Sequence, residues 1–180
     1  MQKRLFTALT LPNDVKKRLF RIVEREYANL PVCWTKPENY HLTLNFLGFI
    51  QEEKILEICE CVSGATKGVK TFEINFFSIE AGPGDREKLI WAVGSSNKEL
   101  ARLKNNLDGQ FGFLARDRKE FTPHITLGRI KKEKWKKLAE APKVKKEFLF
   151  SVPAASVELF ESRFEKGRRV YYIMESFPLE

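Results

Sequence analysis

Two segments of the 180-residue chain repeat one short pattern, and they contain its only two histidines, His41 and His124. The segments are residues 40–48 (YHLTLNFLG) and 121–128 (FTPHITLG), and each includes His-apolar-Thr-Leu. Aromatic and β-branched residues in strict alternation are typical of a β-strand. Alternate residues of a strand point to the same face, so His41 and Thr43 are expected to lie side by side. Each segment therefore predicts a strand with an imidazole and a hydroxyl on one face and apolar side chains on the other.

The alternative interpretation is a duplicated fold that keeps a structural histidine in each copy. A single histidine on a strand is more often structural than catalytic. With ordinary residue frequencies, however, the probability that chance places both histidines in the same His-apolar-Thr-Leu pattern is less than about 1%. A buried neutral histidine also needs specific partners, and an apolar residue would pack more easily. The doubled pattern therefore favours a functional pair.

The predicted elements follow the same order twice: strand, helix, histidine strand, helix, strand, turn, strand. Strands are expected at residues 4–11, 40–48, 71–79, 88–93, 121–128, 148–152, 156–160 and 169–174, and helices at 13–27, 52–62, 97–109 and 131–139. In the first two helices we expect Asn13 to be the N-cap, Leu56 to face inward and Gly64 to end the helix. Corresponding features lie about 83 residues apart, which suits a duplicated α+β lobe better than a solenoid repeat.

These observations predict an α+β fold in which residues 1–180 form a single bilobal domain. Two pseudo-symmetric lobes would each contain an antiparallel sheet with helices on its outer face. The symmetry would bring the two histidine strands to corresponding positions on either side of a groove between the lobes. The active site is expected in that groove.

Charge and cysteine content narrow the possible partners and location. The formal net charge of +8 favours an anionic partner, nucleic acid first, although a generic basic surface accounts for charge alone equally well. The three cysteines, Cys33, Cys59 and Cys61, are an odd number without regular spacing, which argues against a disulfide framework and for a reducing cytoplasm. No apolar run reaches the ~18 residues of a membrane span, and the N-terminal residues do not form a signal peptide.

Two imidazoles on opposite sides of a bound group can act as a general acid–base pair near neutral pH. Thr43 and Thr126 could donate hydrogen bonds to the non-bridging oxygens of a phosphate held between them, as in-line displacement requires. Arg129 could add positive charge. Strict alternation would place it on the face opposite His124, so a bulge or the flexibility of Gly128 must redirect it. The sequence contains no carboxylate cluster or metal-ligand spacing, so we expect chemistry without a metal or cofactor.

A 2′,3′-cyclic phosphate on RNA is a reactive ester that suits such a site, and the basic charge would recruit the RNA chain. Tyr40, Phe46 and Phe121 lie near the histidines and could stack on a terminal base, with core packing as the competing interpretation. Lysines of the basic helix are candidate RNA contacts, unless they form a solvated face. They are Lys131, Lys132, Lys134, Lys136 and Lys137.

Segments with characteristic motifs extend along nearly the whole chain. They are residues 4–9, 11–12, 34, 37–39, 41–48, 121–129, 159–162 and 167. In these segments the sequence resembles the two-histidine (2H) phosphoesterase superfamily, and within it the RNA 2′,3′-cyclic phosphodiesterases formerly called 2′-5′ RNA ligases. The resemblance implies a bilobal fold and the hydrolysis of 2′,3′-cyclic phosphate ends to 2′-phosphate ends without metal or nucleotide. It matches His41 with the proton donor and His124 with the proton acceptor, and it matches Thr43, Thr126 and Arg129 with phosphate-contacting positions.

Three alternatives remain open. The same site could run in reverse and join RNA ends through a 2′-5′ bond. The chain could be a non-catalytic RNA-binding module, or it could act on small cyclic nucleotides. Pseudo-symmetry also allows either histidine to take either proton-transfer role. The expected partner is RNA with a 2′,3′-cyclic phosphate end, tRNA fragments included, and one chain with two lobes is sufficient as a monomer.

Overall fold

The computed structural model describes residues 1–84, 88–112, 121–140 and 142–180. The described strands are β1 (Gln2–Thr10), β2 (Val32–Trp34), β3 (His41–Gln51), β4 (Phe72–Gly82), β5 (Leu89–Gly94), β6 (His124–Ile130), β7 (Lys145–Ala154), β8 (Ser156–Glu165) and β9 (Arg168–Pro178). The helices are α1 (Asn13–Tyr27), α2 (Ile55–Thr66), α3 (Lys98–Gln110) and the short α4 (Lys132–Trp135), with 3-10 turns η1 (Pro37–Asn39) and η2 (Glu52–Lys54). The predicted α+β class is confirmed.

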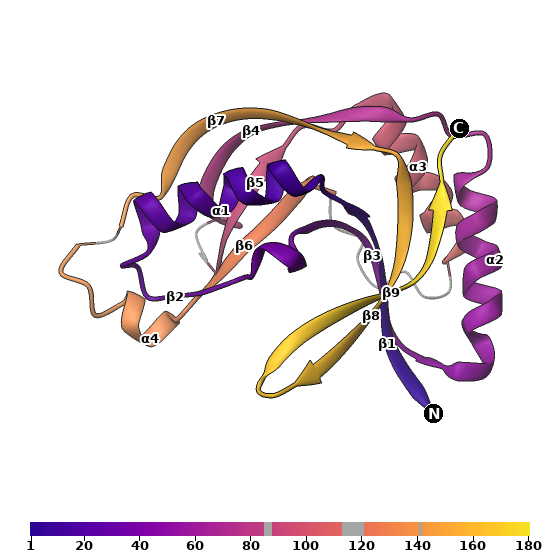
Figure 1. The fold of residues 1–180 in the computed structure, drawn as a ribbon, viewed down its shortest axis with the longest axis horizontal. Coiled ribbons are helices and arrows are strands. Elements are labelled where there is room, and N and C mark those ends of the chain that lie inside the picture. The colour runs from indigo at the N-terminus through magenta and orange to yellow at the C-terminus, as the bar shows by residue number, and fades with distance from the viewer. Residues whose placement is uncertain (85–87, 113–120, 141) are drawn as a thin grey trace.

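The nine described strands join one antiparallel sheet in the order β7-β4-β5-β6-β3-β1-β8-β9, and β2 pairs with β6. The sheet consists of two groups of strands. One group contains β7, β4, β5, β6 and β2, and the other contains β3, β1, β8 and β9. The groups meet between β6 and β3, through the single pair Leu42–Ile125. Helices α2 and α3 lie side by side (Figure 1), with α2 beside β8 and β9 and α3 beside β3 and β4. Helix α1 lies beside β7. This arrangement places the two histidine strands next to each other in the middle of the sheet.

The two halves of the sequence exchange elements between these groups. The hairpin of β8 and β9, from the second half, pairs with β1. Helix α1, from the first half, packs beside β7, where the Arg18 guanidinium lies 4.4 Å from the centre of the Phe148 ring and Lys146 Nζ lies 2.6 Å from a Glu26 oxygen. Each group of strands is therefore built from both halves of the chain.

The apolar stripes that predicted the helices form one continuous core. Leu100, Leu103 and Leu107 of α3 follow helical spacing and are fully buried. Burial of each such leucine contributes roughly 2 kcal/mol of hydrophobic free energy. Asn97 caps this helix, with its side-chain oxygen accepting a 2.8 Å hydrogen bond from the Leu100 amide. No helix in the described part of the chain has the length and apolar character that crossing a membrane requires.

Several local expectations are wrong. Asn13 is the first residue of α1 rather than its cap, because Pro12 occupies the N-cap position and no side chain caps the helix. Helix α2 continues through Gly64 to Thr66, and Leu56 is 77% exposed. Strand β2 was not among the predicted strands, and its pairing with β6 supplies the hydrogen bonds that make it a strand.

Gly128 of β6 offers a direct test of this packing. A Cβ atom there would lie 2.5 Å from Val32 Cγ1 and 2.7 Å from a Trp34 ring carbon, so Gly128→Ala must displace β2. We expect a loss of about 1–3 kcal/mol in unfolding free energy, measured by urea denaturation. Gly109→Ala is the matched control, because its Cβ meets nothing within 4 Å and alanine favours the helix. Equal stability of the two variants would contradict the close approach of β2.

Candidate active site

The pairing of Leu42 with Ile125 determines the layout of the candidate site. Both side chains are buried, so the residues on either side of them point to the opposite, accessible face. In an antiparallel pair, the residue before one partner lies opposite the residue after the other. His41 therefore lies toward Thr126, and His124 lies toward Thr43. These four polar side chains come together on one face of the sheet, and all four are partly exposed.

Both imidazoles are held in the same orientation by a backbone carbonyl two residues earlier. His41 Nδ1 lies 2.7 Å from the Asn39 oxygen, and His124 Nδ1 lies 2.8 Å from the Thr122 oxygen. A carbonyl oxygen only accepts, so Nδ1 carries the proton in each ring. Nε2 is then the nitrogen without a proton in the neutral ring. In His41 this atom lies 3.0 Å from Thr43 Oγ1 and accepts the threonine hydroxyl's hydrogen bond.

Burial favours the neutral form of both imidazoles. Desolvation lowers the pKa of His41 from 6.5 to about 4, with smaller contributions in the same direction from the Lys16 and His124 charges, while the Asn39 carbonyl opposes the shift. Desolvation also lowers the pKa of His124, against the hydrogen bond to Thr122. Both rings are therefore neutral near pH 7 when no ligand is bound, and each Nε2 can accept a proton.

Each histidine strand has a β-bulge just after its threonine. Along β6, Trp91 pairs with Thr126 and Ile90 pairs with Gly128, so Leu127 has no partner of its own on β5. The extra residue changes the alternation, and Arg129 is exposed between buried neighbours. This is the redirection that the alternation of the sequence required, and it returns Arg129 to the face of His124.

The equivalent bulge in β3 puts a different residue in the equivalent position. Ala8 pairs with Thr43 and Thr7 pairs with Asn45, so Leu44 is the extra residue. Phe46 then takes the place that Arg129 has in β6, and its ring is 61% exposed. The two halves of the site are therefore alike in backbone but different in chemistry, cationic beyond His124 and aromatic beyond His41.

An aromatic wall surrounds His41, and no local pattern in the sequence predicted most of it. The rings of Phe6, Phe160 and Tyr171 have their centres 5.0, 5.9 and 5.2 Å from the centre of the imidazole. Phe6 and Phe160 stack at 5.0 Å with an 8° interplanar angle. These residues come from β1, β8 and β9, and only the strand order brings them together. On the other side, the Trp91 ring lies 4.7 Å from the His124 ring.

The other residues proposed for base stacking lie in different surroundings. The Tyr40 ring is 1% exposed within the main core, so it has no face open to a base. Phe121 packs against the same core, and Lys104 Nζ lies 5.6 Å from the centre of its ring. Of the three candidates, Phe46 alone is largely exposed. A cavity of about 120 Å³ adjoins His41 between η1, β3 and the β8–β9 hairpin.

The basic helix is shorter than expected and its lysines lie on the surface. Helix α4 covers Lys132–Trp135, and the candidate contacts Lys131 and Lys132 at its start are exposed. Among the described residues, no three His, Cys, Asp or Glu side chains gather as a metal-binding group.

Comparison with known proteins identifies the family of the chain. The model of the family described as LigT like Phosphoesterase matches the chain twice, at residues 9–91 and 92–171. The chain belongs to this family. Each match contains one of the two His-x-Thr motifs, and together they cover most of this phosphoesterase.

Proteins with similar sequences support the assignment to this family. An RNA 2′,3′-cyclic phosphodiesterase from Thermotoga maritima is 32% identical over 148 residues, covering 76% of each chain. A protein of the same name from Methanothermobacter thermautotrophicus is 29% identical over 186 residues, covering 99% of this chain and 100% of the other.

Solved structures agree with the fold. The crystal structure of TT0787 of Thermus thermophilus matches with a TM-score of 0.83 at 25% identity, covering 98% of this chain and 97% of the other. Escherichia coli LigT complexed with 3′-AMP matches with a TM-score of 0.82 at 24% identity, covering 99% of each chain.

The lowered pKa of His41 makes a prediction about stability. An unfolded histidine binds its proton near pH 6.5, whereas folded His41 resists protonation until about pH 4. Its contribution to stability is therefore complete above pH 6.5 and is lost as the pH falls toward 4. The loss should not exceed about 3 kcal/mol, because the ring keeps partial exposure. Urea denaturation between pH 4 and 7 should show this slope in the wild type.

His41→Gln should remove that part of the slope. The carboxylates whose pKa is lowered by ion pairs, Glu26 and Glu161, give both proteins the same background dependence. The difference between the two curves therefore isolates the histidine. Parallel curves would contradict the desolvation of His41.

Proposed function

We propose that the protein hydrolyses RNA 2′,3′-cyclic phosphate ends to 2′-phosphate ends by general acid–base catalysis with His41 and His124. The observation that carries the proposal is the shared face of the two imidazoles, each with Nδ1 held by a carbonyl so that Nε2 is the nitrogen without a proton. The names of the relatives support the substrate, and the net charge of +8 supports a polyanion.

In the proposed reaction the cyclic phosphate lies between the two imidazoles. One neutral imidazole takes a proton from water as the water oxygen attacks phosphorus. The bond between phosphorus and the ribose O3′ breaks, and the second, protonated imidazole gives its proton to O3′. The products are a 2′-phosphate and a free 3′-hydroxyl. These steps require no metal, and Thr43, Thr126 and Arg129 would hold the non-bridging oxygens.

The phosphate itself would prepare the pair for catalysis. Both histidines are neutral in the free enzyme, but the acid must be charged. A bound anion raises the pKa of a neighbouring imidazole, so substrate binding favours one protonated ring. We assign His41 as the proton donor and His124 as the acceptor, following their positions in the family motif. The roles exchange in the reverse direction.

Reverse ligation through a 2′-5′ bond would use the same site with an RNA 5′-hydroxyl in place of water. We propose it only as a side reaction, because water at about 55 M outcompetes a dilute hydroxyl unless binding aligns it. We also propose that residues 1–180 act as one domain and as a monomer, because both histidines come from one chain. Three free cysteines, Cys33, Cys59 and Cys61, support a reducing cytoplasm.

Product analysis tests the reaction directly. A short RNA with a 2′,3′-cyclic phosphate end, in EDTA, should give a 2′-phosphate end with a bell-shaped dependence on pH. His41→Ala and His124→Ala should each lower kcat by about a hundredfold to ten-thousandfold, with a cooperative urea transition at pH 7 that shows the variants to be folded. A fully active single variant would rule out the acid–base pair. RNA binding without turnover would indicate a binding module, and turnover of cyclic mononucleotides alone would indicate the smaller substrates.

Arg129 provides a second test. If its guanidinium binds the phosphate, Arg129→Ala should lower kcat/KM by about tenfold or more, and Arg129→Lys should recover part of the loss. Lys67→Ala is the control, because it removes an exposed cation at the end of α2, to which no RNA contact is assigned. Similar losses in Arg129→Ala and Lys67→Ala would show that net charge, rather than a phosphate contact, is responsible.

A further inference from the structure

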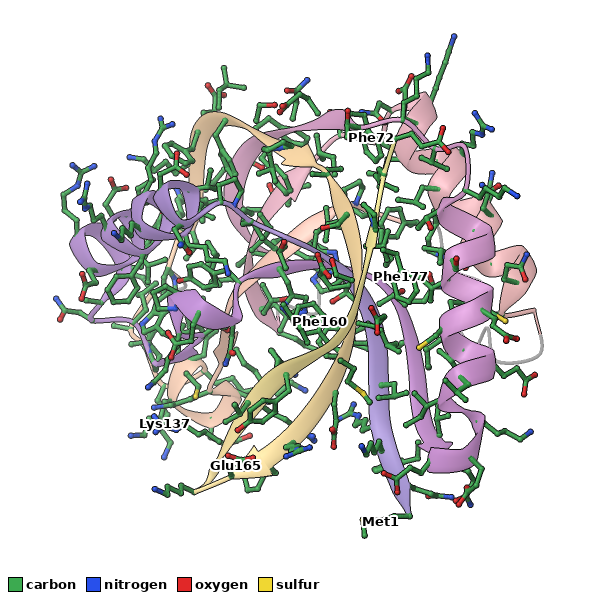
Figure 2. All side chains as sticks on the ribbon, turned by 45° about the vertical axis from the view of Figure 1, so that its right-hand side comes forward. Met1, Phe72, Lys137, Phe160, Glu165 and Phe177 are labelled. Atoms are coloured by element: carbon green, nitrogen blue, oxygen red, sulfur yellow. The ribbon has the colours of Figure 1, made fainter. Side chains whose placement is uncertain are left out.

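The β8–β9 hairpin extends beyond the rest of the sheet (Figure 1). Phe160 lies at its base and Glu165 at its tip (Figure 2). In its ladder Ser162 pairs with Tyr171 and Phe164 pairs with Arg169. Paired residues of an antiparallel ladder share a face, and so do alternate residues of each strand. One face of the hairpin therefore presents Phe160, Ser162, Phe164, Arg169, Tyr171 and Ile173.

This face continues directly from the candidate active site. The rings of Tyr171 and Phe160 border His41 at 5.2 and 5.9 Å. Asn39 connects the hairpin to the imidazole from two sides. Its side-chain amide donates a 3.2 Å hydrogen bond to the Arg169 carbonyl, and its own carbonyl accepts from His41 Nδ1 at 2.7 Å. The hairpin is thus fixed relative to the histidine.

Moving outward from His41, the same face becomes exposed, apolar and cationic. Ile173 is 56% exposed and Phe164 is 67% exposed. The Arg169 guanidinium lies 5.8 Å from the centre of the Phe164 ring and donates a 3.3 Å hydrogen bond to Ser162 Oγ. Arg169 has no ion pair with a carboxylate anywhere in the described ranges, and its face of the hairpin contains none.

The opposite face is different in charge. It pairs Glu161 with Tyr172 and Glu165 with Arg168. Glu161 accepts two hydrogen bonds from Arg163 at 2.9 and 2.8 Å, and Glu165 accepts from the Tyr172 hydroxyl. Cations on this side are balanced by carboxylates, which repel a polyanion. The two faces of one hairpin therefore differ in what they can bind.

An exposed aromatic ring beside an unpaired arginine is the combination that binds single-stranded nucleic acid, through stacking on the base and charge on the phosphate. We propose that this hairpin face, which we call the RNA arm (Phe164, Arg169, Tyr171 and Ile173), binds the nucleotides immediately 5′ of the cyclic phosphate end. This inference rests on the proposed function.

The direction in which the bound RNA strand runs follows from the asymmetry of the site. Arg129 draws the phosphate toward the His124 side, so the ribose and base extend toward the aromatic wall of His41. The strand then continues along the RNA arm, where Arg169 lies about 7 Å beyond Tyr171.

The test compares two substrates in each variant: adenosine 2′,3′-cyclic phosphate and an RNA of about ten nucleotides with the same cyclic end. The readout is the ratio of KM for the long substrate to KM for the short one. Phe164→Ala and Arg169→Ala should each raise this ratio by about tenfold. Arg169→Ala should also reduce the slope of log KM against log salt concentration by about 0.7 for the long substrate.

Arg168→Ala is the matched control, because it removes the same charge from the neighbouring position on the opposite face. Equal ratios in Arg168→Ala and Arg169→Ala, or an unchanged ratio in Phe164→Ala, would overturn the RNA arm while leaving cyclic phosphate opening intact. If the wild type opened the cyclic phosphate of neither substrate, the proposed function would be overturned instead. Sedimentation could also show that the wild type self-associates. If Phe164→Ala abolished this self-association and left the KM ratio unchanged, the face would be assigned to a second copy of the chain.

Discussion

The contact between β3 and β6 is the constraint on which the candidate site depends. Two groups of strands meet there through one pair, Leu42 with Ile125, whose side chains are anchored in the core. Burial of this pair forces the flanking histidines and threonines to the other face. A shift of one residue in this register would bury the imidazoles and expose the leucine and isoleucine, at a cost of several kcal/mol. The hydrophobic effect therefore positions groups that are themselves polar.

Local sequence patterns predicted most elements, because helix stripes and strand alternation depend on neighbouring residues. The failures occurred where the outcome depends on distant partners. Val32–Trp34 becomes a strand because β6 lies beside it. Leu56 is exposed because α2 turns its other face to the core. The exchange of α1 and the β8–β9 hairpin between the groups of strands leaves no local signal, since a repeat shows that two units are related but not which strands they contribute.

The same distinction between local patterns and distant partners decides which residues of the candidate site could be predicted. His41, Thr43, His124 and Thr126 could be identified because the repeated motif marks them, and the need for a bulge before Arg129 followed from counting alternation. The aromatic wall could not be identified, because Phe6, Phe160 and Tyr171 belong to three strands that only the sheet order brings to His41. Tyr40 lies next to His41 in the sequence, yet strand alternation sends its ring into the core.

Duplication explains the matched geometry, and divergence explains the different chemistry of the two halves. Each half keeps the carbonyl that orients its imidazole and the bulge after its threonine, because both are backbone features that tolerate side-chain change. The residue after the bulge is free to differ, and it is Phe46 in one half and Arg129 in the other. A symmetric site would bind a phosphate in two equivalent orientations. Under the proposed function the aromatic and cationic ends would remove that equivalence, and an asymmetric substrate would have one favoured direction, with its anion toward Arg129 and its apolar faces toward His41.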